Sequence, residues 1–436
     1  MSNIKQFLQK VIKSSIHSKN VRNASWLIGE QLFQMLISFV LSILSARYLG
    51  PSNYGTLNYT ASFVAFFTSI ASVGLESVVL NKMIASPEKE GEYLGNSILL
   101  RLFAALFSSV SVSLIVFALN PSDNIKLTLV MLQSIQLVFK AFQILDYWFQ
   151  RYLLVKYVAI GKMLASVIVS GYKIFLLAYA KSLIWFAVSN TLTDLIISFV
   201  LLCFYHKVKK QRIVYTLQHS KELLLSGYHF ILSGIVSAVY TQMDKIMIGQ
   251  MLTDKEVGFY STALTICSMW MFVPQAIINT FRPSIMESYN KGEKDEYITR
   301  LKKLYAGVIW ICIFASLFIS FSARVIVTIL YGEEYYSSIL PIRVMIWSEL
   351  FAMVGTARGI WIICEEKSKY VKYYLAIGAM VNLLLNWLFI SHWGMIGAAI
   401  ATLITQITTC IIAPLFFKET RVHTRIVLDS FLFVFK

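Results

Sequence analysis

The sequence predicts an all-α polytopic membrane protein, in which twelve transmembrane helices form two related six-helix bundles around a central cavity. Two observations predict this fold class. Of the 436 residues, 57% are hydrophobic and only 14% are charged, whereas about 25% of the residues of a typical soluble domain are charged. Apolar stretches long enough to cross a bilayer, which takes about 20 helical residues, also recur from one end of the chain to the other.

The charge and the cysteines argue against several other classes. The formal net charge is +16, but lysine and arginine lie mainly between the apolar stretches, so we expect contacts with lipid headgroups and no nucleic acid. The cysteines are Cys203, Cys267, Cys312, Cys364 and Cys410. They are scattered singly through apolar runs, which fits neither a disulfide framework nor a zinc site. We therefore expect no metal and no cofactor.

Residues 1–25 precede the apolar part of the chain. Ile4, Phe7 and Leu8 share one helical face, and lysines occupy the opposite face. This pattern predicts a basic amphipathic arm that lies on the cytoplasmic membrane surface. No cleavable signal peptide is expected, because the first apolar run is longer than a signal h-region.

Twelve predicted spans follow, and they group into two lobes. We place them at 26–46, 57–78, 97–119, 126–146, 157–180, 183–205, 223–250, 257–280, 304–330, 341–364, 371–390 and 394–417. The first six form an N-lobe (26–205) and the last six a C-lobe (223–417). A basic cytoplasmic linker (206–222) joins the lobes, and a cytoplasmic tail (418–436) ends the chain.

The connections between spans alternate between basic and nearly uncharged. The basic set includes the linker, with Lys207, Lys209, Lys210 and Arg212. Because basic connections remain in the cytoplasm, this pattern places both termini there. An even number of spans requires the same arrangement.

The two halves of the chain resemble each other in the short turn after their first span. Leu49–Gly55 aligns with Leu252–Gly258, at an offset of nearly half the chain. Six spans per half predict a parallel repeat, related by an axis along the membrane normal, with a cleft between the lobes.

Charged residues inside the predicted spans are the first candidates for function. Asp244 and Lys245 lie in span seven, where a charge costs at least about 2.5–3.5 kcal/mol and should face protein or water. Tyr240 belongs to the polar stripe that leads to Asp244. Glu30 and Asp194 lie in spans one and six. Charges of both signs at this depth are typical of a hydrated cavity that can also move protons or sodium ions.

Polar stripes on other spans predict a hydrated cavity for an anionic solute. Gln133, Gln136, Lys140 and Gln143 are spaced to share one face of span four. The full set expected to bind the solute is Lys140, Lys173, Arg358, Gln133, Gln136, Gln143, Lys245 and Tyr240.

Other interpretations of these residues stay open. Asp194 and Glu349 are also placed to neutralise lysines, and Asp244 with Lys245 is also a candidate structural pair. Glutamine and serine stripes also join helices, and Arg101 and Lys162 can extend toward the membrane surface. The sequence has no phosphate-binding loop and no H-E-x-x-H motif, so we do not expect an enzyme.

Four motifs resemble one family. Ala46–Gly55 (ARYLGPSNYG) resembles the A-R-x-L-G-P-x-x-[YF]-G signature of Wzx-type O-antigen flippases. These belong to the polysaccharide transporter family of the multidrug/oligosaccharidyl-lipid/polysaccharide (MOP) exporter superfamily. Asp146–Gln150 with Lys156-Tyr157, Asp244–Gly249 with Val257–Tyr260, and Gly394–Thr402 are similar to later family motifs. Thr253-Asp254 departs from the usual Leu-Gly in the second-half turn.

The resemblance implies a MATE-like MOP fold and a flippase of the bacterial inner membrane. The implied substrate is an undecaprenyl-diphosphate-linked oligosaccharide, such as an O-antigen repeat unit, moved from the cytoplasmic to the periplasmic leaflet by alternating access. H⁺ or Na⁺ is the implied coupling ion, with Asp244, Glu30 and Asp194 as the ion-coupling residues. Other polysaccharide-assembly membrane proteins are implied partners. The alternatives are a multidrug or cation antiporter of the same fold, or a membrane-embedded polysaccharide polymerase or ligase.

Overall fold

The computed structural model describes residues 19–209, 211–216 and 218–431, and in these ranges the secondary structure is entirely helical. Most of the predicted surface arm lies outside the described residues, as does the end of the predicted tail. The chain divides into two compact units, one comprising Met1–Ser42 with Phe63–Ile235 and the other Ile43–Ser62 with Val236–Lys436.

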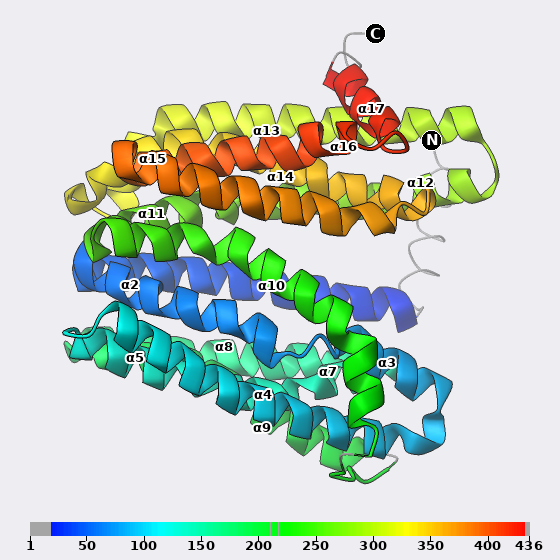
Figure 1. Cartoon of the computed structure of the whole chain (residues 1–436), viewed down its shortest axis with the longest axis horizontal. Helices are drawn as coiled ribbons and strands as arrows, with labels where there is room; N and C mark the ends of the chain where they lie inside the picture. The colour runs from blue at the N-terminus through cyan, green and yellow to red at the C-terminus, as the bar shows by residue number, and fades with distance from the viewer. Residues whose placement is uncertain (1–18, 210, 217, 432–436) are drawn as a thin grey trace, which may run out of the picture. The chain divides into compact units, whose positions relative to one another are not determined.

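The first unit contains parts of two long helices and a set of shorter ones (Figure 1). The long helices α2 (Lys19–Ala71) and α10 (Ser220–Met251) are divided between the units. The remaining helices are α3 (Glu76–Ala85), η1 (Pro87–Lys89), α4 (Glu90–Leu119), α5 (Asn124–Ser134), α6 (Gln136–Lys140), η2 (Ala141–Ile144), α7 (Leu145–Arg151), α8 (Val155–Ala178) and α9 (Leu183–Val208).

The second unit adds the C-terminal helices. They are α11 (Asp254–Met269), α12 (Phe272–Asn290), α13 (Lys294–Leu330), η3 (Glu333–Ser338), α14 (Ile339–Cys364), η4 (Ser368–Tyr370), α15 (Val371–Ile407), η5 (Thr408–Ile412), α16 (Ala413–Leu415) and α17 (Arg421–Phe431). In this unit α14 packs between α13 and α15.

Ten stretches of the described chain are long and apolar enough to cross a membrane, so the chain is a multi-pass membrane protein. Two of them, Gly29–Ala85 and Ser368–Leu415, each exceed twice the length of one crossing. Each contains a glycine with non-helical geometry, Gly50 (φ 69°) and Gly394 (φ 59°). These glycines lie where the sequence predicts turns, so twelve crossings fit the ten stretches and remain a prediction.

The compact units are not divided at the ends of the predicted lobes. Residues 43–62 of α2 belong to the second unit, and residues 220–235 of α10 belong to the first. The predicted boundaries at 26–205 and 223–417 therefore stay a prediction about the repeat.

The predicted span 126–146 lies within the apolar stretch Asn124–Arg151, but the helix there is not regular throughout. The chain instead passes from α5 to α6 and then through the 3₁₀ segment η2 into α7. The Thr191 hydroxyl of α9 donates to the Leu132 carbonyl at 2.8 Å, and the Ser198 hydroxyl donates to the Phe139 carbonyl at 2.6 Å. Hydroxyls from a neighbouring helix thus bond backbone carbonyls along the interrupted segment, which apolar surroundings require.

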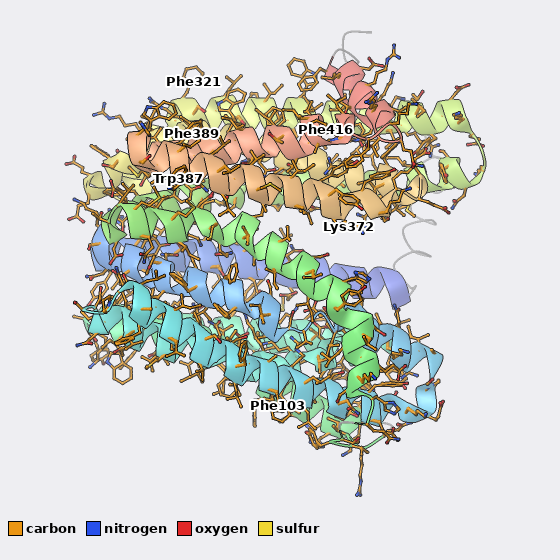
Figure 2. All side chains as sticks on the ribbon, viewed as in Figure 1. Phe103, Phe321, Lys372, Trp387, Phe389 and Phe416 are labelled. Atoms are coloured by element: carbon orange, nitrogen blue, oxygen red, sulfur yellow. The ribbon has the colours of Figure 1, made fainter. Side chains whose placement is uncertain are left out.

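Large aromatic side chains point away from the helices that carry them (Figure 2). Phe103, Phe321, Trp387 and Phe416 are 60–82% exposed. In a soluble protein such exposure would be costly, whereas lipid is a favourable surrounding for these rings.

Helix α17 was predicted only as a basic tail. It is amphipathic and packs against α13 and α14 of the second unit. His423, Ile426 and Val427 are buried on one face, whereas Arg421 and Arg425 are exposed on the other.

Candidate functional site

A row of polar side chains follows the interrupted helix in the first unit. Lys140, Gln143 and Asp146 are spaced three residues apart around η2. A 3₁₀-helix has three residues per turn, so side chains at this spacing lie above one another. The 3₁₀ segment therefore aligns groups that a regular α-helix would gradually rotate apart.

Two ion pairs extend this row to neighbouring helices. The Lys140 Nζ lies 3.8 Å from the Asp194 Oδ2 of α9, and the Gln143 Nε2 donates to the Asp194 Oδ1 at 2.8 Å. The Lys162 Nζ of α8 lies 3.5 Å from the Asp146 Oδ2. Asp194 therefore neutralises a lysine, as the alternative interpretation of this residue expects. We call Lys140, Gln143, Asp146, Lys162 and Asp194 the polar row.

Glu30 of α2 joins the polar row. Its side chain is buried and interacts electrostatically with Lys162 and Asp146. Lys173 of α8 is partly buried and has no hydrogen bond or ion pair with another described residue. The first unit therefore holds ionisable groups of both signs within apolar helices, a pattern typical of transport pathways.

Gln133 and Gln136 do not share the environment of Lys140. Both are buried, with exposed fractions of 0% and 8%, whereas the Lys140 side chain is 30% exposed. The reason is the break at Ile135, which separates α5 from α6 and changes the helical register. Their placement favours helix packing over contact with a solute.

Asp244 is the centre of a buried polar cluster in the second unit. It accepts hydrogen bonds from the Tyr260 hydroxyl at 2.6 Å and the Thr402 hydroxyl at 2.7 Å. It also accepts from the amide Nδ2 atoms of Asn382 at 3.0 Å and Asn386 at 2.6 Å. Four donors compensate the loss of hydration that burial of this carboxylate imposes. We call these five residues the Asp244 cluster.

The neighbours of Asp244 on α10 point elsewhere. Lys245 forms no ion pair within the described chain, since adjacent helical residues project about 100° apart. The structural ion pair between Asp244 and Lys245, which the sequence left open, is therefore absent from the described chain. Tyr240 is partly buried and lies near the Thr409 side chain. Glu349 of α14 is partly buried and has no hydrogen bond or ion pair in the described residues.

The two repeat-related turns meet in the second unit. A Cβ added to Gly55 would lie 1.7 Å from the Asp254 carbonyl oxygen, and one added to Gly258 would lie 2.0 Å from the Pro51 carbonyl oxygen. The Thr56 hydroxyl also donates to the Asp254 Oδ2 at 2.9 Å. Only glycine permits this reciprocal contact, which we call the glycine contact.

The comparison with known sequences decides the family. A family model described as "Polysaccharide biosynthesis protein" matches residues 20–286, which is more than half of the chain. The chain belongs to this family. Within it, the chain is 20% identical to the capsular polysaccharide biosynthesis protein CapF of Staphylococcus aureus, over 92% of this chain and 99% of that protein. It is 21% identical to a putative O-antigen transporter of Shigella flexneri, over 87% and 93%.

Solved structures show the fold that this member of the polysaccharide biosynthesis family adopts. The lipid II flippase MurJ in an inward closed conformation matches with a TM-score of 0.75 and 15% identity, covering 94% of this chain and 91% of that one. An inward-facing MATE transporter of the MOP superfamily matches with a TM-score of 0.70 and 14% identity, covering 91% and 96%. The expected MOP fold is therefore confirmed.

Arg358, predicted to bind solute, is packed inside the second unit of this family member. Its Nη1 donates to the Thr409 carbonyl at 2.7 Å, and its guanidinium lies 4.6 Å from the centre of the Tyr374 ring. The side chain is 9% exposed. These contacts favour a structural role. Arg101 does not extend to the membrane surface either, because it is buried near Glu76.

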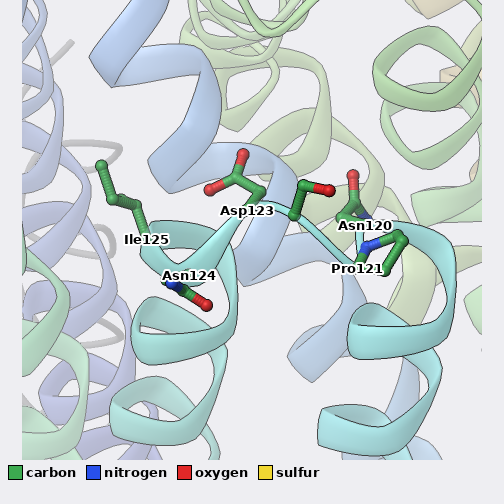
Figure 3. Close-up of a pocket in the computed structure, with 6 residues that line it drawn as sticks. Asn120, Pro121, Asp123, Asn124 and Ile125 are labelled. Carbon is green, nitrogen blue, oxygen red and sulfur yellow. The ribbon is translucent and has the colours of Figure 1, made fainter.

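A hollow at the turn between α4 and α5 contains none of the predicted site residues (Figure 3). It is lined by Asn120, Pro121, Ser122, Asp123, Asn124 and Ile125. The Asp123 carboxylate accepts a hydrogen bond from the Lys126 backbone amide at 3.0 Å, so its role is to cap α5.

Sequence reasoning found Asp244 but missed most of its partners. Asn382 and Asn386 are four residues apart in an apolar stretch, a spacing that places both amides on one helical face. That pattern was a usable signal. Tyr260 lies in a motif that resembles the flippase family, but its contact with Asp244 depends on how α10 and α11 pack.

Proposed function

We propose that this protein is a flippase that moves an undecaprenyl-diphosphate-linked oligosaccharide from the cytoplasmic to the periplasmic leaflet of the bacterial inner membrane. Transport proceeds by alternating access of a central cavity. Membership of the polysaccharide biosynthesis family supports the glycan substrate, as do full-length relatives named for capsule biosynthesis and O-antigen transport. Both termini face the cytoplasm.

The observation that carries the proposal is the environment of Lys140. Its ammonium has three hydrogens to donate, and its ion pair with Asp194 is long, at 3.8 Å. The Asp194 carboxylate already accepts a hydrogen bond from Gln143, and 30% of the Lys140 side chain is exposed. An arriving diphosphate would give this ammonium shorter, charge-assisted hydrogen bonds. Lys173 of the same unit supplies further positive charge.

Ion coupling is assigned to the Asp244 cluster. Five residues supply oxygen atoms there, namely Asp244, Tyr260, Asn382, Asn386 and Thr402. Hard cations such as Na⁺ prefer oxygen ligands. The Asn386 Oδ1 is buried and has no hydrogen-bond partner among the residues that the structure describes, so rotation of that amide would present a carbonyl oxygen to a cation. Protonation of Asp244 is the alternative form of coupling.

A cation antiporter is the second candidate, and a specific observation favours it. The polar row and its neighbour Glu30 contain three carboxylates, those of Glu30, Asp146 and Asp194, against the two ammonium groups of Lys140 and Lys162. A cationic drug would be attracted to such a surplus of acid. The two functions differ in what accumulates when the gene is deleted.

Deletion of the gene tests the proposed function. We expect lipid-linked repeat units to accumulate in the cytoplasmic leaflet and surface glycan to disappear, with both restored by the wild-type gene. Lys140→Ala should fail to restore glycan, because one charge-assisted contact is worth about 1.5–3 kcal/mol, or tenfold and more in binding. The control is Lys181→Ala, which removes an exposed lysine from a predicted outer connection.

Two results would contradict the assignment. Normal glycan in the deletion strain together with increased sensitivity to lipophilic cations would replace the flippase with the cation antiporter. Normal glycan with Lys140→Ala at wild-type protein level would remove Lys140 from the substrate site and leave the flippase standing.

A further inference from the structure

The break between α2 and α3 forms a strained segment in the first unit. Helix α2 ends at Ala71 and α3 begins at Glu76. Between them Val73 (φ 54°) and Gly74 (φ 59°) adopt the left-handed conformation. A β-branched residue adopts it only where the surrounding structure holds it, and such strain is concentrated at functional sites.

Helix α10 holds this segment in place. A Cβ added to Gly74 would lie 2.7 Å from the Phe230 Cβ, and one added to Gly227 would lie 3.0 Å from the Val73 carbonyl oxygen. The N-terminal part of α10 is thus pressed against the break. Because both elements belong to the first unit, the hollow they form is a feature of that unit alone.

The hollow beside the break is large enough for a small molecule. Its volume is about 340 Å³, at the lower end of the range for ligand sites. The residues of its wall that can contact a ligand are Thr68, Ser69, Ser72, Glu76, Ser77 and Phe230. We call it the hydroxyl pocket.

The chemistry of the hydroxyl pocket matches a neutral ring that carries hydroxyl groups. The Thr68 hydroxyl donates to the Val64 carbonyl and the Ser72 hydroxyl donates to the Ser69 carbonyl, each at 3.0 Å. Their hydrogens are therefore engaged, and their lone pairs are left to accept hydrogen bonds from a ligand. The Phe230 ring is 50% exposed and offers an apolar surface for the C–H face of a sugar.

Glu76 excludes an anion and adds a strong acceptor. Its carboxylate interacts electrostatically with the Tyr147 hydroxyl of α7 and with the guanidinium of Arg101 of α4, which is 6% exposed. A carboxylate in the wall repels phosphate and accepts hydrogen bonds from sugar hydroxyls.

We propose that the hydroxyl pocket binds one sugar ring of the transported glycolipid, apart from the lysines that bind its diphosphate. This assignment rests on the proposed function. It divides substrate recognition into a cationic site for the head group and a site for the glycan that is lined by hydroxyl groups and one carboxylate.

Gly234 offers a matched pair of test variants. A Cβ at this position would lie 3.5 Å from the Ser69 side chain, which is ordinary contact, so Gly234→Ala fits. Gly234→Leu would fill the pocket, which Gly234 lines. The full-length protein in nanodiscs would be titrated with two probes, the repeat-unit oligosaccharide released from the strain's own surface polysaccharide and inorganic pyrophosphate.

We expect Gly234→Leu to weaken oligosaccharide binding about tenfold, since a few hydrogen bonds and one aromatic contact are lost, and to leave pyrophosphate binding unchanged. Gly234→Ala, whose smaller side chain fits, should weaken oligosaccharide binding less than Gly234→Leu, and Gly307→Ala, which lies outside the pocket and meets nothing within 4 Å, should resemble wild type with both probes. Thermal unfolding checks that each variant is folded. If Gly234→Leu does not fold, Ser77→Leu fills the pocket from an exposed position on α3.

Unchanged oligosaccharide binding in a folded, pocket-filled variant would overturn the assignment. So would binding of tetraphenylphosphonium that the same variant abolishes, because the pocket would then hold cations. If deletion of the gene removes surface glycan but Gly234→Leu restores it and binds the oligosaccharide normally, the pocket assignment fails alone. If deletion leaves surface glycan intact, the proposed function fails instead.

Discussion

At the scale of single residues, the Asp244 cluster shows what a buried carboxylate needs inside an apolar helix bundle. Tyr260, Thr402 and two asparagines all donate to Asp244. The sequence located the charge because charges are rare in spans. It did not locate the asparagines, although the four-residue spacing of Asn382 and Asn386 in an apolar stretch indicates a shared polar face.

Asp244→Asn should abolish or strongly reduce export. The substitution replaces two acceptor oxygens by one and sets an amide nitrogen against the donors, which costs about 1–3 kcal/mol for each buried group left unpaired. Export would be measured as surface glycan over a range of pH and Na⁺ concentration, with Thr402→Ser as a control that keeps the hydroxyl. Full export by Asp244→Asn at every pH and Na⁺ concentration would remove the residue from ion coupling.

His423 on α17 predicts a pH-dependent stability. Burial lowers the pKa of His423 well below its usual value, and the nearby Arg358 lowers it further. The ring is therefore neutral in the folded protein, whereas it gains a proton below about pH 6.5 in the unfolded chain. The unfolded state then binds more protons, so this contribution to stability is present above pH 6.5 and is lost as the pH falls toward the folded pKa.

The check is thermal unfolding and protease cleavage of α17 at pH 7.5 and pH 5. The wild-type protein should lose more stability between the two values than His423→Gln, which has no titrating ring. An equal loss in both proteins would show that the titration of His423 does not govern the docking of α17.

At the scale of elements, the glycine contact predicts that replacing glycine by alanine costs different amounts of folding stability at different positions. Gly55→Ala and Gly258→Ala each place a methyl group onto a backbone carbonyl, and such overpacking costs about 1–3 kcal/mol. Gly355→Ala on α14 meets nothing within 4 Å and should be neutral or stabilising by about 1 kcal/mol. Thermal unfolding of the three variants compares them directly. Equal midpoints would argue against the contact.

The positions of several spans were predicted closely, whereas the irregular geometry inside span four was not. The prediction 183–205 corresponds to α9 (Leu183–Val208), and 223–250 corresponds to α10 (Ser220–Met251). The break at Ile135 has no glycine or proline beside it, and hydroxyls of α9 donate to backbone carbonyls on either side of it. Such a break depends on another helix, and local sequence does not encode it. In α17, charged residues stand between the apolar ones, so the apolar face of the helix was not predicted from the sequence.

At the scale of the whole molecule, the topology follows from the positive-inside rule and is open to a direct test. A reporter fused after Lys209 should be cytoplasmic and one inserted at Glu333 periplasmic, because these positions lie in predicted connections of opposite type. Alkaline phosphatase activity and fluorescence of a cytoplasmic reporter give the two readouts. The reverse result at both positions would place the termini outside.

The reciprocity of the glycine contact has a consequence for the origin of the chain. Gly55 meets the backbone near Gly258, and Gly258 meets the backbone near Gly55. Two copies of one surface that face each other across a two-fold axis touch in this way. We infer that a half-length protein formed a homodimer before its gene was duplicated and fused. In that homodimer a single glycine made both halves of the contact.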